Sequence, residues 1–161
     1  MDALTDRRAE SASAAPVRLR IPDAGVDAPV DAVGVQADGQ MEVPEDAARV
    51  GWYRFGPAPG HPGSVVLAGH VDDAWGRAGS LAALHEVREG AEVEVELEDG
   101  TTTTYRIGSR EQVAKADLAV DRLFARQGPE QLVLITCTGE WSRLSGHYED
   151  NLVVVATPVE G

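Results

Sequence analysis

The chain has 161 residues, of which 43% are hydrophobic, and this is enough for one domain with a real core. Its formal net charge of -13 argues against a surface for nucleic acid or anionic membranes, because phosphate binding requires clustered Lys and Arg. An acidic surface could favour amine-bearing partners, although solubility alone explains it as well.

Residues 1–15 are rich in Ala, Ser and charged side chains and contain no apolar run of signal-peptide length. We expect them to be a disordered lead-in to one domain over residues 16–161. No stretch of the chain is apolar for long enough to cross a membrane, so we expect the chain as given to be soluble.

Short apolar segments separated by Pro, Gly and Asp follow, a pattern typical of many short strands with tight turns. In 92–98 aliphatic side chains alternate with glutamates, and Asp99-Gly100 predicts a hairpin turn. We interpret these glutamates as the solvated face of a strand, and not as a catalytic acid pair. The segments predicted as strands are 17–21, 26–35 with an interruption at Pro29, 64–68, 92–98, 101–107, 131–136 and 151–156.

Two segments do not fit a strand. Residues 51–63 are rich in Gly, Pro and aromatic side chains and predict an ordered loop. Residues 80–87 predict one or two helical turns, with Leu81, Leu84 and Val87 on one face. Many strands, one helical segment and few signs of parallel crossovers together predict a mostly β fold, namely a mostly antiparallel barrel that is closed or nearly closed.

Cys137 is the only cysteine, and it directly follows the apolar strand predicted at 131–136. A lone thiol can form neither an intramolecular disulfide nor a thiolate metal cage. Two interpretations stay open: a buried apolar side chain, or a catalytic thiol. A catalytic thiol needs a lowered pKa or an adjacent base, because the thiolate is the nucleophile, and histidine is the obvious partner.

His70 is the best of the histidines as that partner. It follows the strand predicted at 64–68 in the same way that Cys137 follows its own strand, so neighbouring strands could present both residues at one rim. His147, just before the last strand, is the second choice. His61 in the loop and His85 in the helical segment have no local context that suggests catalysis.

Several motifs resemble those of sortases. Leu134-Ile135-Thr136-Cys137 is similar to the threonine-to-cysteine signature at which sortases carry their nucleophile, and Gly69-His70 is similar to their histidine site in the same chain order. The likeness runs from about Pro16 to Pro158 and is most like actinobacterial class F sortases. It implies a closed barrel of about eight strands with short helices. The other similar segments are Gly51-Trp52-Tyr53, 68–72, the hairpin at 99–100, 138–143 and 146–156.

The resemblance implies a cysteine transpeptidase that cleaves a Leu-Pro-any-Thr-Gly sorting signal after threonine. Cys137 would attack the threonine carbonyl, and His70 would protonate the leaving amine and later deprotonate the incoming one. The partners would be surface proteins with sorting signals and the amine of the peptidoglycan precursor lipid II. We expect a monomer on the extracytoplasmic membrane or cell-wall face, with no nucleic-acid partner, metal or cofactor.

Sortases also supply an arginine for the oxyanion. Many carry it at the start of the last strand, where this chain has Glu149-Asp150-Asn151. Arg143 is the only arginine after Cys137, and class F sequences carry one at a similar point, so Arg143 is our candidate. A solvated loop arginine is the plain alternative, and Arg110 is the fallback.

Two further residues are candidates for substrate binding. Thr136 could position the substrate through its hydroxyl, although a strand needs no such reason for a β-branched residue. Trp141 could wall an apolar groove for the leucine and proline of the signal.

Other functions fit the sequence less well. L,D-transpeptidases use a Ser-His-Gly-Cys type cluster, in which a histidine comes just before the nucleophilic cysteine. This chain has Ile135-Thr136 before Cys137 instead. Papain-like peptidases place the cysteine before the histidine in the chain. A catalytically degenerate sortase-like barrel that binds a peptide or protein partner is the alternative of a different class, favoured only by the missing arginine at the last strand.

Overall fold

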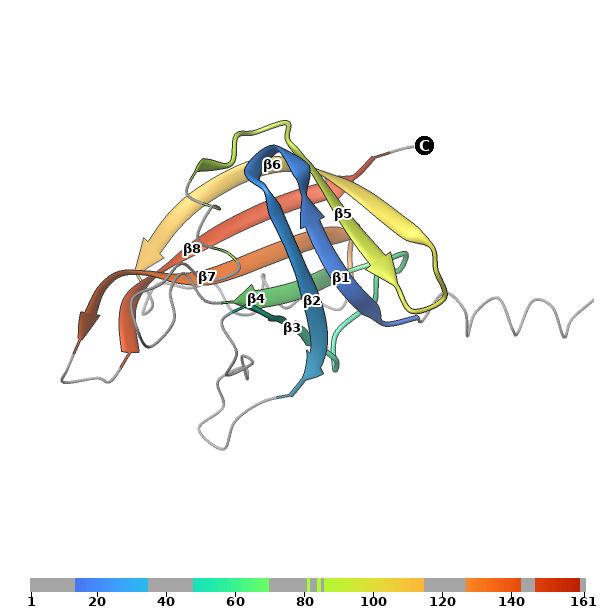
Figure 1. Cartoon of the computed structure of the whole chain (residues 1–161), viewed down its shortest axis with the longest axis horizontal. Coiled ribbons are helices and arrows are strands. Elements are labelled where there is room, and N and C mark those ends of the chain that lie inside the picture. The colour runs from blue at the N-terminus through green and yellow to red at the C-terminus, as the bar shows by residue number, and fades with distance from the viewer. Residues whose placement is uncertain are drawn as a thin grey trace, which may run out of the picture.

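The computed structural model describes residues 14–34, 48–69, 81, 84, 86–114, 127–142 and 147–159, with the backbone alone at 114, 137–142 and 147–151. Its strands form one closed barrel in the order β1-β2-β3-β4-β7-β8-β6-β5 (Figure 1). The predicted mostly β closed barrel is therefore confirmed. The strands are β1 (Pro16–Ile21), β2 (Val26–Val33), β3 (Val50–Tyr53), β4 (Ser64–Gly69), β5 (Glu92–Leu97), β6 (Thr102–Ala114), β7 (Gln131–Ser142) and β8 (His147–Pro158).

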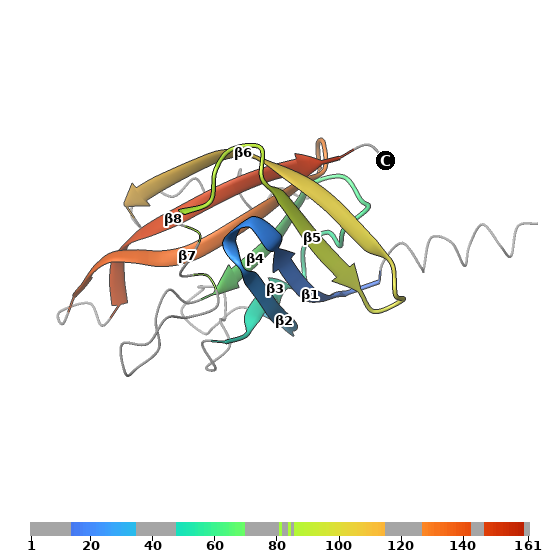
Figure 2. The ribbon, with the colours of Figure 1, turned by 45° about the horizontal axis from the view of Figure 1, so that its top comes forward.

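Most neighbouring strands run antiparallel, as predicted, but two pairs are parallel. β2 pairs with β3 in parallel, and so does β4 with β7. Both views of the molecule show β4 and β7 side by side and pointing the same way (Figures 1 and 2). The sequence pattern did not predict these pairs, because parallel strands need long connections whose course no local motif reveals.

The barrel buries two apolar clusters, one on each face of the β4–β7 pair. The main cluster fills the interior and includes Val65 and Leu67 of β4 with Leu132 and Leu134 of β7. The alternate residues of the same two strands belong to a second cluster on the opposite face. This explains why both strands read as continuous apolar runs. The buried members of the second cluster are Val66, Ala68, Val133, Ile135 and Val153.

Several predicted strand limits were wrong. β2 continues through Pro29, which pairs with Arg18 of β1. The strand tolerates this proline because β2 pairs with β3 only from Val30 onward, so no hydrogen bond to β3 depends on the N–H that proline lacks. β3 (Val50–Tyr53) includes residues 51–53, which were predicted to belong to the loop, because Trp52 and Tyr53 suit a strand. β6, β7 and β8 are longer than predicted, because pairing with one another carries them beyond their apolar segments.

The hairpin of β5 and β6 matches its prediction closely. Val93, Val95 and Leu97 are buried, and Gly100 has a φ of 90° at the turn. On the outer face, Arg20 of β1 donates to Glu94 and Glu96 at 3.3 and 3.0 Å. The alternation predicted this solvated strand face, and the structure adds the ion pairs with Arg20.

The segment predicted as helical is described only in part. Leu81, Leu84 and Val87 are all buried in the main cluster, which confirms that they share a core-facing side. The amide of Leu84 donates to the carbonyl of Leu81 at 3.1 Å, a spacing of three residues. Over the described ranges of the chain, no helix is long and apolar enough to span a membrane.

Candidate active site

The parallel pair of β4 and β7 brings two predicted motifs together. Its register runs from Ser64 opposite Gln131 to Gly69 opposite Thr136. Gly69 immediately precedes His70 in the chain, and Thr136 immediately precedes Cys137. The two motifs are more than sixty residues apart in sequence and end side by side at one end of the same strand pair.

Thr136 bridges the two strands at this end. Its side chain is on the face of Leu132 and Leu134, and the residue is 1% exposed. Its hydroxyl donates a hydrogen bond to the carbonyl oxygen of Gly69, with 2.9 Å between Oγ1 and the oxygen. A buried hydroxyl without a partner would be costly, so this bond meets the need of Thr136 and holds the last residue of β4 against β7.

The other predicted site residues are described less fully. The backbone of Cys137 lies within β7 opposite Asn151 of β8, and that of Trp141 lies opposite Tyr148. His70 and Arg143 lie outside the described residues. The structure therefore shows where the backbone carries Cys137 and Trp141, and it gives a direct side-chain contact for Thr136.

Arg110, the fallback arginine, has a described partner elsewhere. It lies on β6 opposite Val154, and β8 in turn places Val154 opposite Leu134, not Cys137. Its Nη1 donates to the carbonyl oxygen of Val87 at 2.7 Å. This hydrogen bond anchors the segment before β5 to β6 and occupies one of the guanidinium donors.

The family comparison covers almost the whole barrel. The model of the sortase domain matches residues 19–159, which include all of the candidate residues. The chain belongs to the sortase family. Sortases are cysteine transpeptidases of the extracytoplasmic, membrane-associated kind. Among curated proteins, no sequence match was found.

Solved sortases share the fold. Sortase A from Corynebacterium diphtheriae, a lid mutant, is similar with a TM-score of 0.69 and 21% identity, over 91% of this chain and 70% of that chain. Sortase C-1 from Actinomyces oris gives a TM-score of 0.70 and 23% identity, over 91% and 76%. Sortase C1 from Streptococcus agalactiae, in complex with MTSET, gives 0.68 and 21%, over 90% and 69%. At these identities the likeness establishes the sortase barrel fold.

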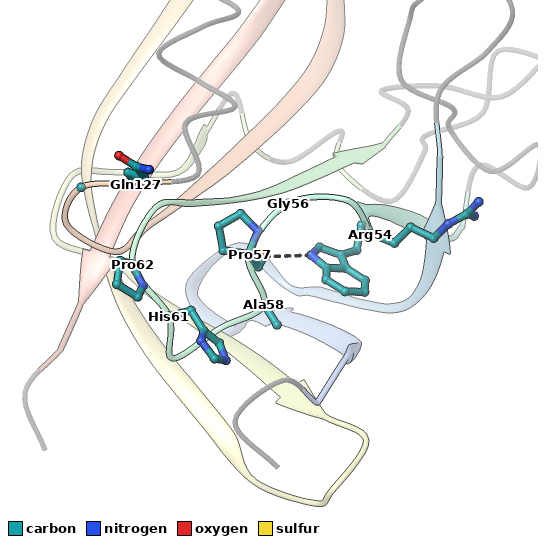
Figure 3. Close-up of a pocket in the computed structure, with 9 residues that line it drawn as sticks. Arg54, Gly56, Pro57, Ala58, His61, Pro62 and Gln127 are labelled. Carbon is teal, nitrogen blue, oxygen red and sulfur yellow. Dashed lines mark hydrogen bonds between the residues drawn. The ribbon is translucent and has the colours of Figure 1, made fainter. Parts of the chain in front are cut away.

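The cleft that the structure describes in this sortase barrel lies away from Cys137. It has a volume of about 590 Å³ and is formed by the loop between β3 and β4 and the segment before β7 (Figure 3). These segments adjoin the starts of β4 and β7, whereas Cys137 follows the Gly69–Thr136 pair. Five residue steps at roughly 3.3 Å put about 17 Å between the two ends of the strand pair, and the loop residues that line the cleft lie at the end away from Cys137. Its lining residues are Trp52, Arg54, Gly56, Pro57, Ala58, His61, Pro62, Gln127 and Gly128.

Trp52 has a structural role at that cleft. It is 7% exposed, belongs to the main cluster, and its Nε1 donates to the carbonyl of Pro57 at 3.4 Å. Nearby, the Tyr105 hydroxyl donates to Glu130 Oε2 at 2.6 Å, and the same oxygen accepts from the Gly60 amide at 2.9 Å. Sequence reasoning missed this junction, because nothing local marks Glu130 as the partner of a buried tyrosine.

No metal centre is described in this sortase. Among the residues with described side chains, no group of three or more His, Cys, Asp or Glu could hold an ion.

Proposed function

We propose that this sortase is an active cysteine transpeptidase with Cys137 as its nucleophile and His70 as its general acid and base. The observation that carries the proposal is the β4–β7 register, which ends with Gly69 opposite Thr136. Consecutive Cα atoms are about 3.8 Å apart, so His70 and Cys137 each begin one residue beyond a paired position. That proximity favours a thiol–imidazole pair.

The reaction we propose has two halves. The Cys137 thiolate attacks the carbonyl carbon of the signal's threonine, the C–N bond to the next residue breaks, and the His70 imidazolium gives its proton to the departing amine. The product is a thioester. An incoming amine then attacks the thioester, His70 takes the proton that this amine loses, and the C–S bond breaks to restore the thiolate.

Each tetrahedral intermediate carries a negative oxygen that needs hydrogen-bond donors. We propose Arg143 for this role, because it follows Cys137 by six residues and class F sortases, which this chain resembles, carry an arginine at a similar point. The Arg110–Val87 hydrogen bond supports this choice, since that contact gives Arg110 a structural task. Loss of one such donor typically lowers kcat by about 100-fold to 1,000-fold.

The substrate we propose is a Leu-Pro-any-Thr-Gly sorting signal on a surface protein. Strand alternation assigns position 137 to the face of Val133 and Ile135, which is apolar. Apolar residues on the strand that carries the nucleophile suit a signal that presents leucine and proline, and we propose Trp141 as a further apolar contact for it.

The finer assignments rest on sequence resemblance. We infer that the chain is a class F sortase of actinobacterial type, that residues 16–161 form its catalytic domain after a lead-in over 1–15, and that it works as a monomer. Its acceptor would be the amine of lipid II, and its location the extracytoplasmic face of the membrane or the cell wall.

The decisive experiment compares wild type with Cys137→Ala on a library of sorting-signal peptides, with and without an amine acceptor. We expect wild type to cleave after threonine, to transfer the product to the amine, and to yield an acyl adduct on Cys137 by mass spectrometry. A methanethiosulfonate that reacts with the thiol should abolish turnover.

The same experiment excludes the competing function. If wild type and Cys137→Ala behave alike on every peptide, the transpeptidase proposal fails. If the wild-type protein binds peptides but forms no adduct with them, it is a catalytically degenerate, peptide-binding barrel.

A further inference from the structure

Two buried polar side chains bridge β4 and β7, one at each end of the strand pair. Ser64 and Thr136 are the buried polar residues among the described part of the chain, each 1% exposed. Gln131 Nε2 donates to the Ser64 hydroxyl at 2.8 Å where the pair starts. The Thr136 hydroxyl donates to the Gly69 carbonyl at 2.9 Å where the register ends. The strand pair is therefore held by side chains as well as by its backbone ladder.

The Thr136 bond acts on a particular peptide group. The carbonyl oxygen of Gly69 is coplanar with the amide nitrogen and the Cα of His70, because the peptide bond is rigid and planar. A hydrogen bond that fixes this oxygen therefore also fixes the plane from which the His70 backbone starts. Gly69 has no side chain to hold it, and glycine has more backbone freedom than any other residue, so the hydrogen bond adds a constraint to the pairing with β7.

The burial of Thr136 limits what else its hydroxyl can do. A threonine hydroxyl has one proton to donate, and here Gly69 receives it. At 1% exposure, the side chain has almost no surface on which to meet a substrate. The geometry thus favours action through the backbone of Gly69 over direct contact with a peptide.

We propose that Thr136 is a positioning residue that sets the distance between His70 and Cys137. It belongs to the strand that carries Cys137 and is bonded to the residue that precedes His70, so one hydrogen bond links the two backbones that deliver the acid–base group and the nucleophile. This inference rests on the proposed transpeptidase function and specifies how its two central residues are kept together.

The test compares Thr136→Val with Thr136→Ser. Valine keeps the shape and lacks the hydroxyl, whereas serine keeps the hydroxyl. We expect Thr136→Val to lower kcat by about 10-fold to 100-fold, since a misplacement near 1 Å has this size of effect. KM should stay within about twofold, because a positioning residue does not bind substrate. Thr136→Ser should recover most of kcat.

Ser64→Ala is the matched control. It removes the other buried hydroxyl from the same strand pair, at the end far from Cys137. We expect it to lower the melting temperature to an extent similar to Thr136→Val, with kcat within about twofold of wild type. If Ser64→Ala and Thr136→Val lower kcat equally, Thr136 only stabilises the fold and the inference is overturned.

A second readout does not depend on peptide turnover. The rate at which iodoacetamide alkylates Cys137 is measured from pH 4 to pH 10 for wild type, Thr136→Val and His70→Ala. We expect Thr136→Val to move the pH profile in the same direction as His70→Ala, because both weaken the pairing of imidazole and thiol. A Thr136→Val profile that overlays wild type overturns the inference.

The outcomes also separate this inference from the proposed function. If wild type transfers peptides and Thr136→Val raises KM alone, the transpeptidase proposal stands, but Thr136 is a substrate contact and the positioning inference is overturned. Wild type that transfers no peptide would refute the proposed function, and the alkylation profiles would still decide whether Thr136 positions His70.

Discussion

At the scale of single residues, the proposed mechanism requires a choice between two arginines. Arg110 and Arg143 are both candidates by sequence, and the structure gives Arg110 a hydrogen bond to the Val87 carbonyl at 2.7 Å. The register puts Arg110 level with Leu134, three residues short of Cys137. A long side chain can cover that distance, but the Nη1 of this one donates to Val87, in the segment before β5.

We therefore predict opposite consequences for the two substitutions. Arg143→Ala should lower kcat by about 100-fold to 1,000-fold with little change in stability. Arg110→Ala should lower the free energy of unfolding by about 1 kcal/mol through the lost bond to Val87, with kcat nearly unchanged. Peptide transfer assays and urea denaturation measure the two effects. Near-normal turnover in Arg143→Ala, with a large loss in Arg110→Ala, would reverse the assignment.

Sequence reasoning could reach Cys137 and Thr136 but not the bond that Thr136 makes. The thiol is unique, and the threonine adjoins it in the motif, so both are visible in a local pattern. The partner of Thr136 is the backbone carbonyl of Gly69. Every residue type has a backbone carbonyl, so no sequence motif marks this one as the acceptor. Backbone acceptors become identifiable only when the register of two distant strands is known.

At the scale of elements, local patterns predicted antiparallel hairpins well and parallel pairs not at all. β5 and β6 follow one another, and their alternation, together with Asp99-Gly100 between them, specifies the pairing. β4 and β7 are separated by two other strands in the chain, and their apolar runs fit many partners. The candidate site lies on such a parallel pair, so its geometry was beyond local prediction.

The turn between β5 and β6 offers a test of how backbone conformation supports the barrel. Gly100 has a φ of 90° and open space where a Cβ would be, so Gly100→Ala would be strained by its backbone alone. We predict a loss of about 1–2 kcal/mol in the free energy of unfolding. Thermal and urea denaturation provide the measurement.

Gly108 on β6 is the matched control for that substitution. A Cβ there would meet the Val155 carbonyl at an ordinary 3.8 Å, and the residue has no positive φ. Gly108→Ala should therefore change the free energy of unfolding by less than about 1 kcal/mol, and it could stabilise the strand by restricting the unfolded chain. Equal losses in Gly100→Ala and Gly108→Ala would show that the turn conformation is not the cause.

At the scale of the whole molecule, the two ends of the β4–β7 pair serve different purposes. One end carries the Gly69–Thr136 bridge and the candidate catalytic residues. The other end carries the cleft (Figure 3). It also carries the junction of Tyr105, Glu130 and Gly60, which ties β6 to the segment before β7 and to the loop after β3. These contacts at the cleft end hold the strands together and so support the positions of β4 and β7 at the end that carries the candidate catalytic residues.

The junction predicts a dependence of stability on alkaline pH. Burial, and then the hydrogen bond to Glu130, raises the pKa of Tyr105 above its ordinary value. An unfolded tyrosine loses its proton near pH 10, so above that pH the unfolded state binds fewer protons than the folded one. The contribution of Tyr105 is fully present below about pH 10 and is lost as the pH rises further, by at most about 1.4 kcal/mol per pH unit.

Urea denaturation of wild type, Tyr105→Phe and Glu130→Gln between pH 7 and pH 11.5 tests this dependence. At pH 7, Tyr105→Phe should be less stable by about 1–2 kcal/mol, because the Glu130 carboxylate loses a buried donor. Above pH 10 its stability should fall less steeply than that of wild type. Glu130→Gln should keep most of the wild-type slope, because burial is the larger cause of the raised pKa of Tyr105. A Tyr105→Phe curve parallel to wild type over the alkaline range would mean that the Tyr105 hydroxyl is not held in its buried, protonated form at this end of the barrel.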